Sequence, residues 1–279
     1  MKRKRTNRRW PYLLALLLAA AATYMTSEEE TAEEQTGTHR LQKEESVESV
    51  EIPAPLSHTP EQIVQRKAYT VSYNRDLKIA NWVAWELTAD KLVERVERDD
   101  RFLPDPDLPA DEAVTTDDYR GSGYDRGHLC PAGDNRWNRK AMEESFYMTN
   151  ICPQNHNLNS GDWKELEETC RRWARQHGSI YIVCGPVLHG KKHRTIGRTQ
   201  RVTVPEGFFK VVLCTRTDPP QAIGFVYNNL PADRPLSAYI HTVDQVEELT
   251  GIDFFTRLPD ECERQVEAVC HPEWWNIKP

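Results

Sequence analysis

The chain has 279 residues, with 36 lysines and arginines, 43 aspartates and glutamates, and a formal net charge of −7. Its apolar fraction of 38% is too low for a polytopic membrane protein. The acidic balance also argues against a protein that coats nucleic acid through bulk positive charge, but it leaves room for a local cationic groove.

The first 26 residues predict an export signal. A basic stretch at residues 2–9 precedes an apolar run at residues 13–22 that ends in alanines. The run is well short of the roughly 20 residues that a spanning helix needs. We therefore interpret residues 1–26 as a signal peptide or an uncleaved signal anchor, and we expect an exported protein, either secreted or periplasmic.

Residues 27–60 predict a disordered acidic linker. They are rich in glutamate and have few large apolar side chains, so they cannot bury enough surface to offset the entropy lost on ordering. From residue 61 the pattern becomes globular, and residues 61–279 suffice for one large domain.

The globular part mixes strands and helices. Strands rich in β-branched and aromatic residues are predicted first, and a proline-containing polar loop follows them. An amphipathic helix and a second group of strands come next, and then a helix that Gly251 ends. In chain order the predicted elements are strands at 68–73 and 80–87, a helix at 162–175, strands at 180–183, 202–204, 208–214 and 222–226, and a helix at 243–249. Without strict alternation of strand and helix, the order favours an α+β fold.

Residues 121–134 form the densest block of chemically versatile side chains, G-S-G-Y-D-R-G-H-L-C-P-A-G-D. In a strand, Arg126 and His128 would share one face. A guanidinium binds phosphate oxygens through two parallel donors, and an imidazole abstracts protons near neutral pH. Asp125 lies beside them, so this spacing predicts a site for phosphate chemistry.

A second polar group lies about 30 residues downstream. Asn159 precedes the predicted helix, where it is either an N-cap or a functional ligand. Within the helix, Glu167 and Arg171 are four residues apart and would ordinarily form a surface ion pair. Asn159 and Glu167 are close to two helical turns apart, so a continuous helix would present them on one face.

These residues resemble a known family, the DNA/RNA non-specific endonucleases of the ββα-metal superfamily, which includes Serratia-type, NucA-like and endonuclease G-like nucleases. The resemblance covers about residues 65–260 and centres on Asp-Arg-Gly-His with its downstream Asn, a specific signal. The segments that carry it are Tyr124-Asp-Arg-Gly-His-Leu-x-Pro-Ala-x-Asp134, Asn150-x-x-Pro-Gln154, Leu158-Asn159, Trp163, Leu166-Glu167, Asn81-Trp82-Val83, Arg98-x-x-x-Phe102-x-Pro-Asp105, 202–213 and 243–251.

The resemblance implies a ββα-metal fold, with a mostly antiparallel central sheet flanked by helices, and an endonuclease that acts on DNA and RNA. It implies that His128 is the general base and that Asn159 is the only direct protein ligand of a divalent cation, Mg²⁺ or else Mn²⁺ or another ion. Glu167 matches the acid that orients water on the metal, and Asp125 belongs to the same motif. Arg98, Arg126 and Arg171 match phosphate-site arginines. Products with 5′-phosphate ends are expected.

A basic segment at residues 189–201 stands out in an acidic domain, since it holds five cations and no acid. It is either a flanking contact to the phosphate backbone or a solvated hairpin loop. The five side chains are Lys191, Lys192, Arg194, Arg198 and Arg201.

The seven cysteines include no C-x-x-C pair, which argues against a zinc ribbon. Cys130 and Cys152 lie near the motif and form either a disulfide across the site or two buried free thiols. Cys262 and Cys270 could pair locally in the C-terminal tail.

Two other functions fit parts of the sequence. A non-catalytic nucleic-acid-binding member of the fold would not need the full set of a base and a metal ligand. A Cys/His hydrolase would use Cys130 or Cys152 with His128. Trp274 and Trp275 either stack on bases or pack the tail, and His156 has no assigned role. The oligomeric state is not determined by the sequence.

Overall fold

The structure is a computed structural model that describes residues 49–231 and 233–278. The predicted leader, residues 1–26, and most of the predicted linker lie outside the described residues. Within the described part of the chain, no helix combines the length and the apolar character needed to cross a membrane.

A seven-stranded sheet forms the centre of the domain, and every neighbouring pair of strands in it is antiparallel. All residues of the two adjacent strands β6 and β9 are buried, which explains the continuous apolar runs seen in the sequence. In spatial order the strands are β1 (Gln62–Gln65), β2 (Thr70–Asn74), β3 (Ile79–Thr88), β6 (Ser179–Val187), β9 (Gly207–Cys214), β10 (Gln221–Asn228) and β11 (Ile240–His241). This arrangement confirms the α+β prediction.

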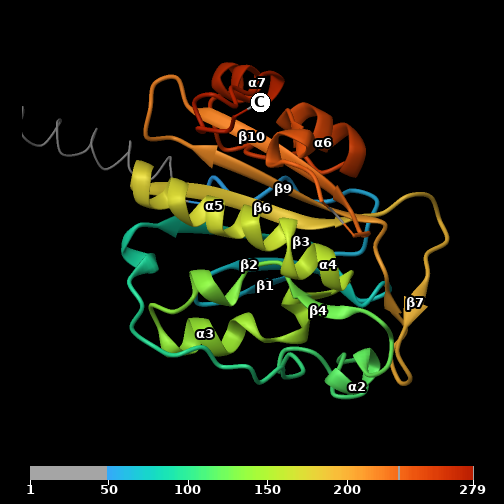
Figure 1. The fold of residues 1–279 in the computed structure, drawn as a ribbon. Coiled ribbons are helices and arrows are strands. Elements are labelled where there is room, and N and C mark those ends of the chain that lie inside the picture. The colour runs from blue at the N-terminus through green and yellow to red at the C-terminus, as the bar shows by residue number, and fades with distance from the viewer. Residues whose placement is uncertain (1–48, 232, 279) are drawn as a thin grey trace, which may run out of the picture. The chain divides into compact units, whose positions relative to one another are not determined.

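Helices cover both faces of the sheet (Figure 1). Alternate residues of β3 enter two separate cores, as the two-residue period of a strand requires. Val83, Trp85 and Leu87 pack in the core of helix α5 (Asp162–His177). Trp82 and Ala84 pack in the core of α6 (Val243–Thr250) and α7 (Asp260–Ala268). The helices α6 and α7 therefore lie on the opposite face from α5.

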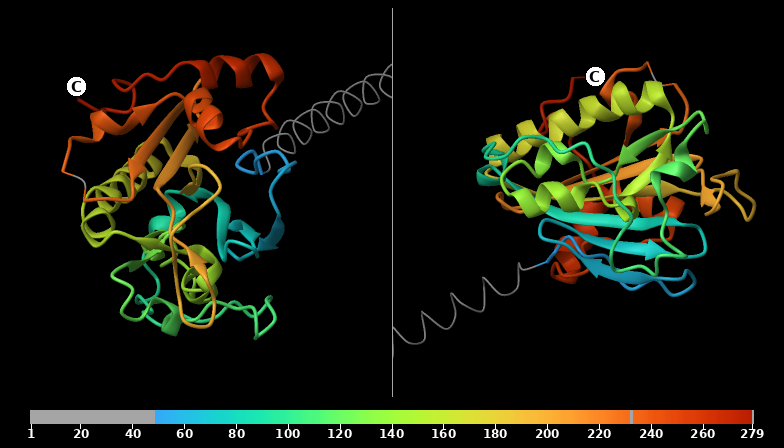
Figure 2. Two further views of the ribbon diagram at one scale, coloured as in Figure 1. Left: turned by 90° about the vertical axis from the view of Figure 1, so that its right-hand side faces the viewer. Right: turned by 90° about the horizontal axis from the view of Figure 1, so that it is seen from below.

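The remaining elements are short. Strands β4 (Asp125–His128) and β5 (Ile151–Gln154) pair as an antiparallel ribbon, and β7 (Thr195–Ile196) pairs with β8 (Val202–Thr203) in a hairpin that projects from the domain (Figure 2). The others are α2 (Thr116–Tyr119), α3 (Arg139–Ser145), α4 (His156–Ser160) and four 3₁₀ turns, η1 (Asp90–Leu92), η2 (Ala132–Asp134), η3 (Met148–Asn150) and η4 (Leu236–Tyr239).

Predicted and observed elements agree except in two places. The predicted strand at residues 202–204 belongs to the small hairpin and not to the central sheet. The predicted helix starting at residue 162 is preceded by a separate short helix, α4, with a break at Gly161. The helix predicted at 243–249 ends as expected, because Gly251 adopts the left-handed conformation that terminates helices.

The disordered linker was predicted to reach residue 60, and this boundary is wrong. Residues 49–60 pack on the domain: Val50 is buried in the core beneath α6 and α7, and Ile52 and Leu56 contact that core. The backbone amide of Ala54 donates to the carbonyl of Asp253 at 2.9 Å. Three large apolar side chains in this segment attach it to the domain.

The C-terminal tail packs on the domain and does not present its tryptophans for base stacking. Trp275 is buried, and the indole Nε1 of Trp173 donates to its carbonyl oxygen at 2.8 Å. Trp274 stacks on His177 with ring centroids 4.3 Å apart.

Candidate active site

The β4–β5 ribbon and the helix that follows it build the site. Because side chains alternate along a strand, Arg126 and His128 share one face of β4, as predicted. Gly127, between them, opposes Cys152, and a Cβ atom at this position would lie 2.1 Å from the side-chain oxygen of Gln154. Only glycine fits there, so the close contact between the two strands depends on it.

The site is a cavity of about 720 Å³ that brings together all seven predicted catalytic and metal-binding residues. They come from a loop, from β4 and from the α4–α5 pair. The seven are Arg98, Asp125, Arg126, His128, Asn159, Glu167 and Arg171. Residues separated by more than 70 positions in the sequence therefore line one space.

Aromatic rings hold the imidazole of His128. The ring packs at 5.4 Å from Phe102 and at 4.8 Å, edge to face, from Phe146. Its Nε2 atom is buried and has no hydrogen-bond partner among the described residues. Burial and the positive charges of Arg98 and Arg126 lower the pKa of His128 to about 3, so the imidazole is neutral at neutral pH.

The same two phenylalanines support arginines at the mouth of the cavity. The guanidinium carbon of Arg126 lies 4.5 Å from the ring centroid of Phe102, and that of Arg98 lies 5.3 Å from the centroid of Phe146. Arg98 also donates to Asp100 at 2.7 Å. Both guanidinium groups are thus held near the imidazole while remaining open to a ligand.

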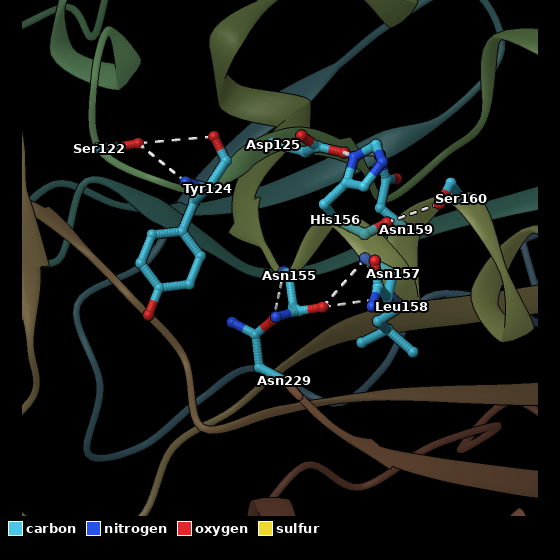
Figure 3. A network of polar contacts seen from close by, with 10 residues as sticks. All are labelled: Ser122, Tyr124, Asp125, Asn155, His156, Asn157, Leu158, Asn159, Ser160 and Asn229. Carbon is cyan, nitrogen blue, oxygen red and sulfur yellow. Dashed lines mark hydrogen bonds and ion pairs between the residues drawn. The ribbon is translucent and has the colours of Figure 1, made fainter. Parts of the chain in front are cut away.

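Asp125 connects β4 to α4, as Figure 3 shows. Its Oδ2 accepts a hydrogen bond from Nδ2 of Asn159 at 2.9 Å and lies 2.9 Å from Nδ1 of His156. No role was assigned to His156 from the sequence, but the residue contacts the motif aspartate from the first position of α4. A short-range signal was absent because the two residues are 31 positions apart.

The N-cap of α4 is Asn155, and the alternative cap role for Asn159 is wrong. The side-chain oxygen of Asn155 accepts from the amides of Asn157 and Leu158. The backbone amide of Asn155 donates to the side-chain oxygen of Asn229 at 2.7 Å, which ties the start of α4 to the end of β10. Asn159 therefore lies within α4, where its side chain is directed to Asp125.

Glu167 and Arg171 do not form a simple surface pair. Arg171 donates to the buried carboxylate of Asp134 at 2.9 Å, and the indole of Trp85 donates to the other oxygen of that carboxylate at 3.2 Å. Glu167 is half-buried in the cavity wall. Burial raises the pKa of Glu167 to about 7, although Lys210 and Arg171 lower it.

Lys210 is a buried cation that the sequence analysis missed. It lies in β9 and is completely inaccessible to solvent. Its Nζ has no hydrogen-bond partner among the described residues and lies 4.6 Å from the ring centroid of Trp163. Burial lowers its pKa, but nearby thiols and the carboxylates of Glu167 and Asp134 raise it above the usual value. The signal was a lysine inside the apolar run Phe-Phe-Lys-Val-Val-Leu at 208–213.

Comparison with known proteins identifies the family. The family model described as DNA/RNA non-specific endonuclease matches residues 50–261. The chain belongs to this family. It is 35% identical over 228 residues to a nuclease of Nostoc sp., covering 77% of this chain and 81% of that protein. It is 33% identical over 208 residues to human mitochondrial endonuclease G, covering 69% of each chain.

A solved structure agrees with the family and with the ββα-metal fold. The crystal structure of an EndoG/EndoGI complex, described as showing the mechanism of EndoG inhibition, superposes with a TM-score of 0.68 at 29% identity. The match covers 75% of this chain and 89% of that one. The chain is accordingly a nuclease of the ββα-metal type, a class that uses a divalent metal and acts on nucleic acid.

In this nuclease the basic segment, residues 189–201, contacts the cavity wall at Tyr124 and at α2. The guanidinium of Arg194 lies 5.3 Å from the ring centroid of Tyr124, a cavity-lining residue. The amides of Thr199 and Gln200 both donate to Asp118 in α2, whose end forms another wall of the cavity. The other four predicted contacts, Lys191, Lys192, Arg198 and Arg201, are exposed on the segment and do not line the cavity.

The cysteines of the nuclease are free thiols. Cys130 and Cys152 are both buried, so of the two alternatives the disulfide is not formed, and Cys262 and Cys270 are also unpaired. Burial raises the pKa of the Cys130 and Cys152 thiols, and neither residue lines the cavity. A Cys/His hydrolase that uses one of them is therefore excluded, because a nucleophilic cysteine must be accessible as a thiolate.

Proposed function

We propose that this nuclease is a Mg²⁺-dependent endonuclease that hydrolyses phosphodiester bonds of DNA and RNA and leaves 5′-phosphate ends. One observation carries the proposal: a neutral imidazole, whose Nε2 has no hydrogen-bond partner in the described part of the chain, shares a cavity with three arginines and with an asparagine fixed by a carboxylate. Phosphodiester hydrolysis requires an activated water, neutralisation of charge and positioning of the phosphate.

His128 acts as the general base that takes a proton from the attacking water. Its neutral state supplies the acceptor, and the rings of Phe102 and Phe146 fix its orientation. A pKa of about 3 describes the protein without substrate. The negative charge of a bound phosphodiester would offset Arg98 and Arg126, and the pKa of His128 would rise towards the value of an effective base.

The donors in the cavity fit a hard divalent cation. Nδ2 of Asn159 is engaged by Asp125, which leaves its Oδ1 for a metal. The carboxylates of Asp125 and Glu167 supply further oxygen atoms, and no thiol is among the residues that line the cavity. Oxygen ligands of this kind suit Mg²⁺ or Mn²⁺. When bound, the ion would stabilise the charge that develops on the phosphate and on the leaving oxygen.

The arginines bind the phosphate, and Glu167 orients water in the cavity. Arg98 and Arg126 offer exposed guanidinium groups at its mouth, where two parallel donors match phosphate oxygens. Arg171 is held deeper, by Asp134, and its position is correspondingly fixed. Glu167, with a pKa of about 7, can accept or donate a proton near neutral pH.

A chelator-controlled digestion assay tests the proposal. Full-length protein is incubated with plasmid and with RNA, with and without EDTA, followed by readdition of Mg²⁺. In parallel, His128→Ala should lower kcat about 10²–10⁴-fold while affinity for DNA is retained. The exposed His271→Ala serves as the matched control. Activity that survives EDTA refutes the metal, and normal turnover of His128→Ala refutes the base. Binding without cleavage in the wild type would identify a non-catalytic member of the fold.

The basic segment contributes contacts to the phosphate backbone beside the cavity. Contact of Arg194 with Tyr124 supports this, and the exposed Lys191 and Lys192 extend the charge along the same segment. Each lost phosphate contact should reduce the slope of log affinity against log salt by about 0.9. The variant Lys191→Ala/Lys192→Ala should show this reduction, and Arg264→Ala on α7 should not.

Export of the nuclease rests on the pattern of residues 1–26, a basic start followed by a short apolar run. Fractionation of the producing cells and N-terminal sequencing of the mature protein test it. A chain found with Met1 intact in the cytoplasm would contradict export, and an intact N-terminus in a membrane fraction would indicate the anchor.

A further inference from the structure

Helices α6 and α7 lie on the face of the sheet opposite α5 (Figure 1). Three of their carboxylates lie close to one another. Asp244 and Glu247 come from α6, and Glu267 comes from α7. One carboxylate oxygen of each residue lies within 4.8 Å of the corresponding oxygens of the other two. Three potentially negative groups therefore converge on one point.

Glu267 is the unusual member of the group, because only 5% of its surface is exposed. Its Oε1 is buried and has no hydrogen-bond partner among the described residues. Glu247 is half-buried, and one of its oxygens accepts from the amide of Phe254 at 2.7 Å. A buried carboxylate without a partner is costly to ionise, so this position requires either a proton or a cation.

The charged neighbours that act most strongly on Glu267 are all acids, and none of them is a cation that could compensate its negative charge. Burial, followed by the negative charges of Glu247, Glu263, Asp244 and Asp253, raises the pKa of Glu267 to about 9. Burial, followed by nearby carboxylates that include Asp253 and Asp244, raises the pKa of Glu247 to about 7. A divalent cation would relieve this repulsion.

We propose that the carboxylates of Asp244, Glu247 and Glu267 bind a Ca²⁺ ion that joins α6 to α7. Ca²⁺ takes oxygen ligands at about 2.3–2.6 Å, so oxygens on either side of it are separated by up to about 5 Å, which is compatible with the observed spacing. The exposed side chain of Asp244 gives the ion a route from solvent. Water would complete the coordination shell, as in other Ca²⁺ sites with few protein ligands.

This site is distinct from the nuclease cavity and does not depend on the proposed function. Binding would cross-link two helices that are otherwise connected through residues 251–259. The ion would act on stability and not on the chemistry of cleavage, because an ion that binds only the folded chain stabilises it by mass action.

Thermal unfolding of the full-length protein tests the site. The protein is freed of metal with EDTA and dialysed, and its Tm is compared with and without millimolar CaCl₂. At ten times the dissociation constant we expect Ca²⁺ to raise Tm by about 3 °C or more. The shift should disappear in Glu267→Gln and in Asp244→Asn. It should persist in Glu261→Gln, which removes an exposed carboxylate from the same helix. Asp244 is exposed, so its variant carries the test even where Glu267→Gln fails to fold.

A further control separates this site from the nuclease cavity. Asn159→Ala should keep the full Ca²⁺-dependent shift, and loss of the shift in that variant would assign the ion to the cavity. The proposal is also overturned where the wild type shows no shift, or where Asp244→Asn and Glu267→Gln keep it. Calorimetric titration should show one Ca²⁺ site fewer in Asp244→Asn than in Glu261→Gln.

Discussion

Buried carboxylates have opposite charge surroundings on the two faces of the central sheet. On the α5 face, Asp134 pairs with Arg171, and the buried Lys210 lies close enough to Glu167 to lower its pKa. On the α6–α7 face, Glu267 is surrounded by other acids. Burial raises the pKa of both glutamates, to about 7 for Glu167 and to about 9 for Glu267.

The difference shows what buried cations do for the nuclease. Desolvation alone favours the neutral acid, and only nearby positive charge restores ionisation. Lys210 and Arg171 leave Glu167 able to ionise near neutral pH, which suits a group that handles protons or orients water. Glu267 has no such cations among its strongest neighbours, so without a metal it keeps its proton. The two buried glutamates therefore differ in their neighbours: Glu167 lies near cations, and the strongest neighbours of Glu267 are acids.

Removing the buried cation should have the largest effect. Lys210→Met replaces the ammonium with an apolar side chain of similar length and leaves Glu167 and Asp134 without its charge. We expect a loss of about 3–5 kcal/mol in the free energy of unfolding, measured with urea, because one partner of a buried charge cluster is missing. The acid limb of the pH–rate profile should move to higher pH. Lys140→Met, an exposed lysine of α3, is the control; equal stability of both variants would mean that the cation is dispensable.

Breaking the ion pair between Asp134 and Arg171 should have an intermediate effect. Asp134→Asn keeps the shape of the side chain but removes the charge that holds Arg171 at 2.9 Å. The expected loss is about 2–3 kcal/mol in unfolding free energy, the range for hydrogen bonds to charged groups, together with a fall in turnover as Arg171 loses its position. A variant within about 0.5 kcal/mol of the wild type would show that the pair contributes nothing net.

The smallest effect is expected at Glu267, on the α6–α7 face, where the free energy of unfolding should depend on pH. The pKa of Glu267 in the folded chain, about 9, exceeds the ordinary glutamate value of 4.5, so the folded state binds the proton more tightly. Without Ca²⁺, the contribution of Glu267 to stability should therefore be greatest at low pH and fall as pH rises between these values, by about 1 kcal/mol per pH unit and so by about 2 kcal/mol over pH 6–8. Glu267→Gln should flatten the urea-unfolding profile over pH 6–8, and an unchanged slope would contradict the comparison.

Much of the fold could be predicted from the sequence, because the signals are local. Runs rich in β-branched and aromatic residues located strands β2, β3, β6, β9 and β10 within a few residues, and helical spacing and a terminating glycine located helices α5 and α6. The motif residues Arg126, His128 and Asn159 were identified by their types and spacing. The helix break at Gly161 was not predicted, since the apolar periodicity of α5 begins only after it.

The sequence by itself thus determined the main strands and helices, the family and seven of the residues that line the cavity, since each rests on a short pattern of side chains. Only the tertiary structure decided which charges are buried and what neutralises them. His156 meets Asp125 across 31 positions, the charge of Lys210 acts on Glu167, and Glu267 meets Asp244 across two helices. Desolvation and Coulomb interactions depend on distance in space, and no local pattern in the chain encodes that distance.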